Sequence, residues 1–332
     1  MEKELIEKIN NMPKVELHLH LDGSIPIEYV KKKYNLTDEQ VKAKMIASEK
    51  CKNLNDYLTC FDFPISIMQT KAEIIEITIE LLKELKAQNV VYAEIRFAPQ
   101  FHTKKGLTQE EVIKAVIEAK NKVDIASNII LCVMRGKDNM NKNFETLNLA
   151  KKYLQKGVCA IDLAGAEAIY NTKEYKNIFE KAVELGVPFT VHAGEADGAE
   201  SVRSAIGFGT KRIGHGVRAI EDDNLLEYIK NNEITLEVCP TSNIQTCICD
   251  SYATHPVYKL FKAGILVTIN TDNMTVSNTT LSNEYINIIE STNITYEDIV
   301  NMNKNSVNAA FISKEEKEEL LRKYWGNKVE NK

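Results

Sequence analysis

The stretch Val15-Glu16-Leu17-His18-Leu19-His20-Leu21 ends a short apolar run with two histidines. Residues two apart on a β-strand point to the same side, so His18 and His20 face one space if this segment is a strand. Imidazole is a common ligand of zinc and similar divalent metals. A single His-x-His pair also arises by chance among surface and core histidines. Its meaning therefore depends on the residues at the ends of the other strands.

Other short apolar runs also end in residues that can bind a metal. His192 and His215 close two such runs, and Asp272 lies shortly after a third. Packing alone does not explain so many polar groups at strand ends, because burying a polar group is costly. The sequence therefore predicts one metal site that leaves room for water, as catalytic zinc sites do. Its predicted ligands are His18, His20, His192 and Asp272.

Eight short runs rich in β-branched residues alternate with longer amphipathic segments. The expected strands are Val15–Leu19, Val90–Phe97, Ile129–Met134, Val158–Leu163, Val187–Val191, Arg212–Gly214, Ile234–Val238 and Leu266–Asn270. Alternation with helices implies parallel pairing, and continuous apolar runs fit strands buried on both faces. A doubly wound open sheet is the alternative, but it concentrates its ligands at one switch point. Polar residues after six of these strands favour a (β/α)8 TIM barrel, an α/β fold with its site at the carboxyl ends of the strands.

The amphipathic segments predict the helices between the strands. Expected examples are Ala72–Gln88, Thr108–Ala126, Glu174–Leu185 and Asn224–Lys230. Thr108 and Glu111 form the capping-box pattern that begins a helix. Residues 35–70 are the longest insertion, directly after the first strand, and we expect them to arch over the mouth of the barrel as a helical lid. The residues after the last strand are expected to form extra C-terminal helices.

Composition limits the class of protein. The chain has 332 residues, 44% of them hydrophobic and 27% charged, and no linker divides it, so we expect one domain spanning residues 1–332. A net charge of -5 gives no reason to expect nucleic acid or an acidic membrane surface as a partner. No apolar stretch approaches the ~18 residues that span a bilayer. The charged segment Met1–Asn10 lacks a signal-peptide core, and the seven cysteines form no CxxC pair, which favours reduced thiols in a cytoplasm.

Two further polar residues lie beside the predicted ligands. Glu195 stands three residues beyond His192, where a carboxyl among apolar lid residues would have a raised pKa and act as a proton donor. A solvated loop glutamate is the alternative. His215 lies between two glycines that let backbone and water come close, so a fifth ligand, a base and a structural histidine are all open. We favour a base or an electrostatic helper to the metal-activated water.

Three more residues are candidates for binding a substrate. Asp22 could accept a hydrogen bond from a polar substrate or cap the next element, because Asp-Gly is also a turn signal. Gly165 offers a backbone N–H after the fourth strand, and Asn273 offers both a donor and an acceptor. This combination indicates a planar ligand with several ring heteroatoms rather than a simple ester.

Other polar residues receive plainer interpretations. Glu94 and Arg96 on the second strand are expected to form a buried ion pair, and His255 is interpreted as structural. Arg203 and Arg218 are the basic candidates near the motifs for a phosphate site, and each is also interpreted as structural. The region after the fourth strand has no lysine of the kind that bridges two metals in binuclear hydrolases on this barrel, so a single metal is expected.

Taken together, the motifs resemble the adenosine deaminase family of metal-dependent hydrolases. They occur in order over nearly the whole chain, as Met12–Ser24, Asp162–Gly165, His192–Glu195, Gly214–Gly216, Glu237–Asn243 and Asn270–Asn273. The family implies a barrel with one zinc ion per chain. It also implies hydrolytic deamination of the purine nucleosides adenosine and deoxyadenosine to inosine and deoxyinosine, with release of ammonia.

The resemblance also implies roles for individual residues. The family's zinc ligands match His18, His20, His192 and Asp272. Its proton donor matches Glu195, and its water-activating histidine matches His215. Its substrate contacts match His20, Asp22 and Gly165. The apolar wall over the purine is similar to Leu54, Tyr57, Leu58 and Phe61 in the expected lid.

One position departs from the most familiar family pattern, which has a second aspartate and then a proline after the metal aspartate. Here Asn273-Met274 stands in that place. An asparagine amide can still donate to an acceptor such as the purine N7. We therefore expect activity to be kept, with an effect on affinity and substrate range.

Three alternatives stand beside adenosine deamination. A sibling enzyme would act on adenine, on a 6-substituted adenosine derivative or on a nucleotide. A binding protein on the same barrel would need neither Glu195 nor His215. Hydrolysis of an amide or phosphoester fits poorly with residues suited to a purine, and the H-x-E…P-C-x-x-C signature of cytidine deaminases is missing from the sequence.

Overall fold

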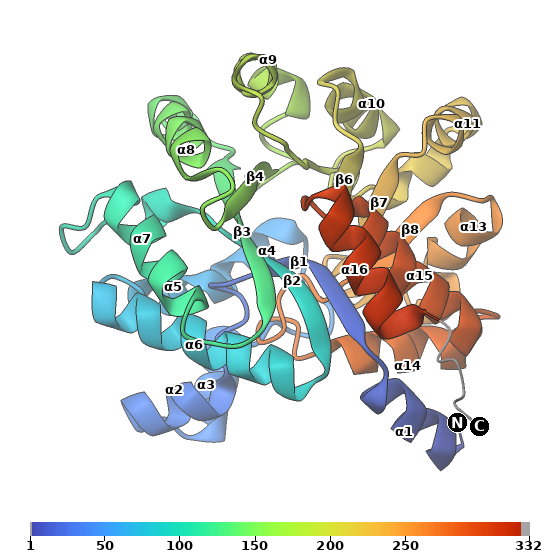
Figure 1. Ribbon diagram of the computed structural model, residues 1–332, viewed down its shortest axis with the longest axis horizontal. Coiled ribbons are helices and arrows are strands. Elements are labelled where there is room, and N and C mark those ends of the chain that lie inside the picture. Colours follow the sequence, from blue (N-terminus) through green and yellow to red (C-terminus); the bar gives the residue numbers. More distant parts are fainter. Residues whose placement is uncertain (1, 327–332) are drawn as a thin grey trace.

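The computed structural model describes residues 2–326, in which parallel strands alternate with helices (Figure 1). The strands pair in sequence order as two four-stranded sheets, β1-β2-β3-β4 and β5-β6-β7-β8. Their bounds are Lys14–His20 (β1), Val90–Phe97 (β2), Ala126–Met134 (β3), Val158–Ala164 (β4), His192–Ala193 (β5), Arg212–His215 (β6), Thr235–Val238 (β7) and Leu266–Ile269 (β8). Every pairing within the two sheets is parallel.

Isolated bridges join the two sheets at both edges. Leu19 of β1 pairs with Asp272 beyond β8, and Ile161 of β4 pairs with Phe189 before β5. The ring of strands is thus complete, and Figure 1 shows the helices arranged around it. The predicted TIM-barrel fold is confirmed.

Most helices lie outside the barrel or at the end of the chain. The ring consists of α6 (Lys71–Ala87), α7 (Gln109–Lys120), α8 (Met140–Tyr153), α9 (Lys176–Leu185), α10 (Ala199–Gly207), α11 (Asp223–Asn231) and α13 (Val257–Lys262). The ring also includes α15 (Tyr296–Ala309), which contacts β8 and β1. Outside this ring are α1 (Lys3–Asn11), α12 (Pro240–Gln245), α14 (Leu281–Ser291) and α16 (Lys314–Trp325). Among the described residues, no helix is long and apolar enough to cross a membrane.

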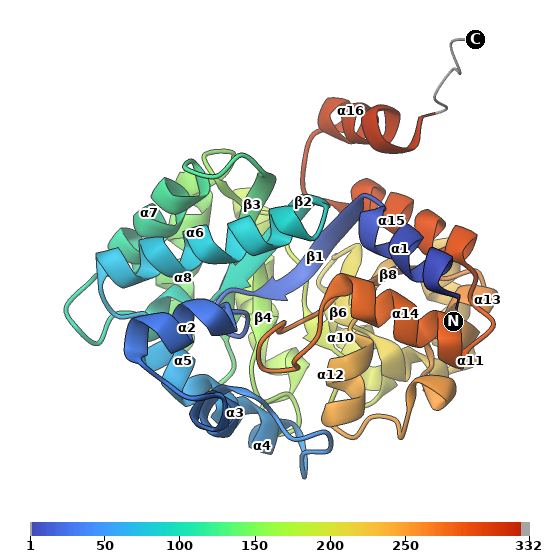
Figure 2. The ribbon, with the colours of Figure 1, turned by 90° about the horizontal axis from the view of Figure 1, so that it is seen from below.

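The insertion after β1 is mostly helical, as predicted. Helix α2 (Ile27–Tyr34) comes before residues 35–70, and the helices within them are α3 (Asp38–Met45), α4 (Leu54–Leu58) and α5 (Asp62–Ser66). Figure 2 shows these helices at the end of the barrel away from α16. At the opposite end, Leu320 of α16 packs against a buried cluster that includes Val15 and Leu17 of β1. The two ends of the barrel are therefore covered by different parts of the chain.

The fifth strand differs from its predicted bounds. It begins at His192 rather than at Val187. Pro188 has no N–H to donate to a ladder, and Phe189 makes only an isolated bridge with β4. The apolar run thus leads into the strand instead of forming it.

The helix predicted over residues 108–126 is shorter than expected. It ends at Lys120, because Ala126 already pairs with Tyr92 at the start of the ladder between β2 and β3. Its start is as predicted, since the Thr108 side chain accepts the backbone N–H of Glu111 and completes the capping box.

Candidate active site

Barrel closure brings four side chains from three strand ends together. His18 and His20 lie at the end of β1, His192 begins β5, and Asp272 follows β8. Their ligand atoms all lie within 4.8 Å of one another. The Nε2 atoms of His18 and His20 are 3.0 and 3.2 Å from Nε2 of His192. Both are 3.4 Å from Oδ1 of Asp272.

These spacings fit a single tetrahedral metal. Zinc–ligand bonds of about 2.0–2.1 Å at tetrahedral angles place neighbouring ligand atoms about 3.3 Å apart. Histidine nitrogens and a carboxylate oxygen are also donors that zinc accepts. The structure therefore brings the four predicted ligands into an arrangement that can hold one metal ion.

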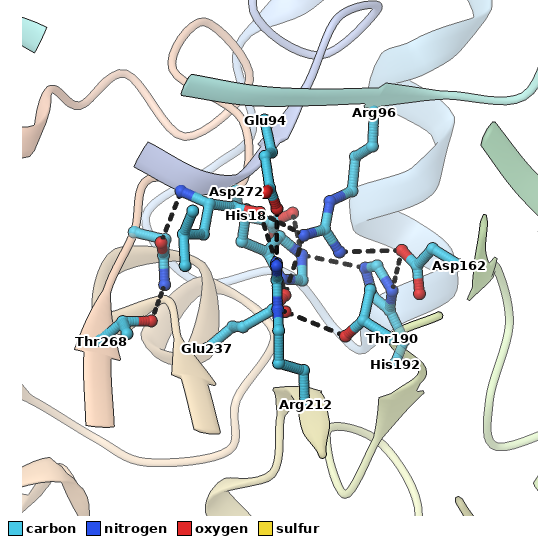
Figure 3. Close-up of polar contacts among 12 residues, drawn as sticks. His18, Glu94, Arg96, Asp162, Thr190, His192, Arg212, Glu237, Thr268 and Asp272 are labelled. Carbon is cyan, nitrogen blue, oxygen red and sulfur yellow. Dashed lines mark hydrogen bonds and ion pairs between the residues drawn. The ribbon is translucent and has the colours of Figure 1, made fainter. Parts of the chain in front are cut away.

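Carboxylates behind two of the histidines determine which ring nitrogen faces the metal position (Figure 3). His18 Nδ1 lies 2.9 Å from Glu237 Oε2, and His192 Nδ1 lies 2.9 Å from Asp162 Oδ2. His18 hydrogen-bonds Glu237 through Nδ1, so it presents the lone pair of Nε2 to a metal. The contact of His192 with Asp162 is an ion pair without hydrogen-bond geometry, and the negative charge behind the ring favours a hydrogen on Nδ1 there as well. Arg96 donates to both carboxylates at 2.8 Å and so joins the two ligands in one buried network.

Arginine charges keep these two carboxylates ionised. Burial alone would raise the pKa of Glu237, but Arg212 and Arg96 hold it well below its usual range. Burial also opposes ionisation of Asp162, but His192 and Arg96 lower its pKa. Neither carboxylate was predicted from the sequence to have a role. A charged residue inside an apolar strand is rarely buried without a partner, and that signal could have marked both.

The predicted ion pair between Glu94 and Arg96 is wrong. Arg96 pairs with Asp162 and Glu237, while Oε2 of Glu94 lies 2.6 Å from Nη1 of Arg212. Residues two apart on a strand point to the same side and project in parallel. Glu94 and Arg96 therefore both enter the barrel, where each meets an opposite charge from another strand.

Glu195 is buried beside the metal ligands, with 4% of its surface exposed. Its Oε2 lies 3.6 Å from Nε2 of His215, and both groups lie within 4.8 Å of the Asp272 carboxylate. Burial raises the pKa of Glu195 well above its usual range, and the charges of Asp272 and Glu167 raise it further. The raised pKa favours the protonated form of this carboxyl, which can donate a proton.

The loop that carries Glu195 is held by Glu167, a residue that the sequence analysis missed. The Glu167 carboxylate is 1% exposed and accepts the backbone N–H groups of residues 194–197 at 2.7, 3.0, 2.6 and 3.0 Å. It also accepts the hydroxyl of Ser201 at 2.5 Å. These contacts fix the backbone from which the Glu195 side chain projects.

Two site residues adopt a left-handed backbone conformation. His215 has φ of 59° and Asp272 has φ of 60°. For residues other than glycine this conformation costs about 1–3 kcal/mol, and such strain clusters at functional sites. The last residue of β6 and the turn after β8 are therefore strained where they carry these two side chains.

A cavity of about 430 Å³ opens in front of these residues. The predicted substrate-binding residues His20, Asp22, Gly165 and Asn273 all line it. The predicted apolar wall is also present, formed by Leu54, Tyr57, Leu58 and Phe61 of the lid. The volume suits a small molecule rather than a polymer.

Two polar residues that line the cavity have buried oxygen atoms without a hydrogen-bond partner. Asp22 does not cap a helix; its Oδ2 is 3.7 Å from Nε2 of His102. The amide of Asn273 donates from Nδ2 to the Tyr57 hydroxyl at 3.0 Å, and that hydroxyl lies 2.7 Å from Ser277 Oγ. Oδ1 of Asp22 and Oδ1 of Asn273 are buried and have no hydrogen-bond partner within residues 2–326. Such atoms beside a cavity indicate places where a ligand binds.

Two basic side chains that were not predicted from the sequence as site residues also line the cavity. Lys104 is exposed at its rim, whereas Arg135 is buried and donates to main-chain and hydroxyl oxygens, including the His192 carbonyl at 2.7 Å. Arg203 and Arg218 do not line it, and each pairs with a nearby carboxylate. The cavity thus has one free surface lysine and no arginine cluster suited to a phosphate.

Comparison with known proteins adds independent evidence. A family model described as adenosine deaminase matches residues 13–325. The chain belongs to the adenosine deaminase family. The adenosine deaminase of Haemophilus ducreyi is 43% identical over 324 residues, which cover 92% of this chain and 94% of that protein. The adenosine deaminase of Clostridium acetobutylicum is 40% identical over 330 residues, covering 96% and 98%.

Solved structures of related proteins share the fold. The N6-mAMP deaminase of Arabidopsis is 25% identical with a TM-score of 0.84, covering 96% of this chain and 99% of that one. The adenine deaminase of Arthrobacter aurescens is 22% identical with a TM-score of 0.82, covering 94% and 98%. A Burkholderia ambifaria amidohydrolase with bound Zn is 20% identical with a TM-score of 0.86, covering 98% and 92%. The last two, at this identity, establish the fold alone.

Proposed function

We propose that this chain hydrolyses adenosine and deoxyadenosine to inosine and deoxyinosine with release of ammonia. Relatives about 40% identical over nearly the whole chain are adenosine deaminases. The observation that carries the proposal is the pairing, in one cavity, of a four-ligand metal position with the buried carboxyl of Glu195, whose pKa is raised. A metal-activated water and a proton donor are what hydrolysis at a purine ring carbon requires.

One zinc ion per chain suits the ligand set. The proposed ligands are His18, His20, His192 and Asp272. When bound, the ion would lower the pKa of a water molecule and so supply the nucleophile at neutral pH. The carboxylates behind His18 and His192 would keep the ligand nitrogens unprotonated and oriented.

Glu195 is the proposed proton donor to the purine ring. As the nucleophile adds to C6, its carboxyl gives a proton to N1, so negative charge does not build up on the ring. The addition product then carries a hydroxyl and an amino group on one carbon, and it collapses with loss of ammonia. His215 faces the same space as Glu195 and acts on the attacking oxygen.

Four residues are proposed to bind the nucleoside, namely His20, Asp22, Gly165 and Asn273. The free oxygen of Asp22 can accept a substrate hydroxyl. The Asn273 amide gives one hydrogen of Nδ2 to Tyr57, and its second Nδ2 hydrogen can be donated to a ring nitrogen such as N7. Leu54 and Phe61 of the lid would cover the apolar faces of the purine.

A nucleoside suits this cavity better than a nucleotide. The carboxylate of Asp22 lies inside, where it would repel a phosphate, and only Lys104 stands free at the rim. The structure of an N6-mAMP deaminase keeps a sibling activity as the second candidate. A cytoplasmic location, and the lack of a nucleic-acid or membrane partner, stay predictions from the sequence.

Ultraviolet absorbance of purified protein with adenosine tests the proposal. We expect adenosine and deoxyadenosine to be converted, the rate to fall on chelation, and zinc to restore it. Adenine, AMP and N6-methyl-AMP serve as competitors in the same assay. Faster conversion of one of these would favour a sibling deaminase. No spectral change with zinc fully loaded would contradict a deaminase and favour a binding protein.

A further inference from the structure

A chain of buried hydrogen bonds leads away from the cavity behind His215. Its Nδ1 lies 3.0 Å from Nδ2 of Asn243, in α12. The other amide atom, Asn243 Oδ1, lies 3.1 Å from Nε2 of His255. Nδ1 of His255 in turn lies 3.0 Å from the backbone nitrogen of Val257. All three side chains are at most 2% exposed, so water does not compete for these contacts.

The backbone N–H at the end of this series of hydrogen bonds determines the direction of each of them. The N–H of Val257 can only donate, so Nδ1 of His255 accepts. Burial lowers the pKa of His255 to about 3, which leaves the ring neutral with its one hydrogen on Nε2. That hydrogen must go to an acceptor, so the Asn243 oxygen faces His255. The Asn243 Nδ2 group then donates to Nδ1 of His215.

We infer that Asn243 and His255 are positioning residues that fix His215 in the tautomer with its hydrogen on Nε2. A hydrogen on Nδ1 of His215 would point at the donor Nδ2 of Asn243 only 3.0 Å away. Nε2 of His215 is buried and has no hydrogen-bond partner in the described part of the chain. It faces Glu195 at 3.6 Å, beside the Asp272 carboxylate.

The tautomer decides between two roles for His215 in the deamination proposed above, on which this inference rests. A general base needs a lone pair on the nitrogen that faces the attacking water. An Nε2–H group instead donates a hydrogen bond to that oxygen, which orients it and stabilises the charge that develops on it. The hydrogen-bond chain makes His215 a donor, so His215 would not take the proton of the water. The nucleophile would instead be hydroxide, because a bound metal would lower the pKa of the water enough for its proton to be lost to solvent before the attack.

Asn243→Asp is a nearly isosteric change that reverses the direction of the hydrogen bond to His215. A carboxylate accepts from both neighbours, so His215 would move its hydrogen to Nδ1 and present the lone pair of Nε2. Nitrogen NMR of protein labelled with 15N-histidine reads this directly, because protonated and unprotonated ring nitrogens have different shifts. The chain has six histidines, and a His215→Phe variant assigns the signals of His215. We expect Nε2–H in the wild type and Nδ1–H in Asn243→Asp.

Kinetics provide the second measurement. Asn243 does not line the cavity, so Asn243→Asp should leave KM for adenosine nearly unchanged while kcat falls about 10²- to 10³-fold. His255→Phe keeps the ring volume and removes the Nε2–H donor, which frees the Asn243 amide to rotate. In that variant we expect both tautomers of His215 and a smaller loss of kcat.

Asn128→Asp is the matched control. Asn128 is a half-buried amide that donates to the Tyr92 hydroxyl at 3.2 Å and does not line the cavity. This variant should keep the wild-type tautomer and kcat. An Nδ1–H signal from wild-type His215, or wild-type kcat in Asn243→Asp, would overturn the inference. A protein with the Nε2–H tautomer that converts no adenosine would overturn the proposed function instead.

Discussion

The histidines on the two sides of the cavity are backed by different chemical groups. His18 and His192 place Nδ1 against buried, ionised carboxylates, which leaves the Nε2 lone pair for a metal. His215 places Nδ1 against the amide of Asn243, which leaves a hydrogen on Nε2. The same kind of side chain is thus a proposed metal ligand on one side and an inferred hydrogen-bond donor on the other. The group behind the ring determines its role.

The largest effect on kcat is expected on the side of the cavity with Glu195 and His215. Glu195→Gln removes the acid and leaves the carboxylates behind the metal ligands intact. We expect kcat for adenosine to fall about 10²- to 10⁴-fold, because an amide cannot supply the proton. Metal analysis should still find one zinc ion per chain. Unchanged kcat in this variant would remove Glu195 from the mechanism.

The next effect is expected on the side that holds the metal. Asp162→Asn puts an amide behind His192, as Asn243 stands behind His215. Zinc affinity, measured by competition with a chelator, should fall about 10- to 100-fold. Asp124→Asn, which changes an exposed carboxylate paired with Lys86, is the control and should bind zinc normally. Equal affinities in the two variants would show that the carboxylate does not support the ligand.

A smaller effect on substrate binding is expected where Tyr57 of the lid contacts Asn273, in the turn after β8. Tyr57→Phe removes the hydroxyl that accepts from the Asn273 amide. Loss of one neutral hydrogen bond should raise KM about 3- to 10-fold and leave kcat nearly unchanged. Tyr285→Phe, which loses a buried hydroxyl bonded to Asn303 away from the cavity, is the matched control. If the two variants have the same KM, the lid contact does not hold the substrate.

A separate effect, on stability and not on activity, extends the comparison to carboxyl groups. Glu237 is paired with arginines, whereas the partners found for Glu284 are the Thr279 hydroxyl and the hydroxyl and N–H of Thr241. Burial raises the pKa of Glu284 to about 7 from a reference value of 4.5. Between these values the folded protein binds more protons than the unfolded chain, so stability falls as pH rises.

Glu284→Gln tests this dependence through urea unfolding of the metal-free protein. The stabilisation from the protonated carboxyl is fully present below about pH 4.5 and is lost by about pH 7, at up to about 1.4 kcal/mol per pH unit. The variant should show a flatter dependence across that window. Identical pH profiles for the two proteins would mean that Glu284 is not protonated in the fold.

The features that were predicted correctly from the sequence are those that depend on local sequence patterns. Alternation of apolar runs with amphipathic segments gave the barrel, and the residues that end those runs gave the four ligands that the structure brings together. The beginning of α7 followed from the Thr108 cap. Each strand, ligand position and helix start can be recognised from residues that are close together along the chain.

Contacts across the barrel were not predictable in this way. The wrong pairing of Glu94 with Arg96 arose because spacing along one strand does not tell which charges stand opposite. The carboxylates behind His18 and His192 were missed for the same reason. The role of His255 depends on the direction of three successive hydrogen bonds, which no spacing of residues encodes.

The metal position lies across the seam between the two four-stranded sheets. His18 and His20 belong to the first sheet, whereas His192 and Asp272 belong to the second sheet and the turn beyond it. Each half of the barrel therefore contributes only two of the four proposed ligands. A chain in which one half has folded has no partial site and no partial chemistry to perform. Activity in this architecture reports that the whole ring has been assembled, first strand to last.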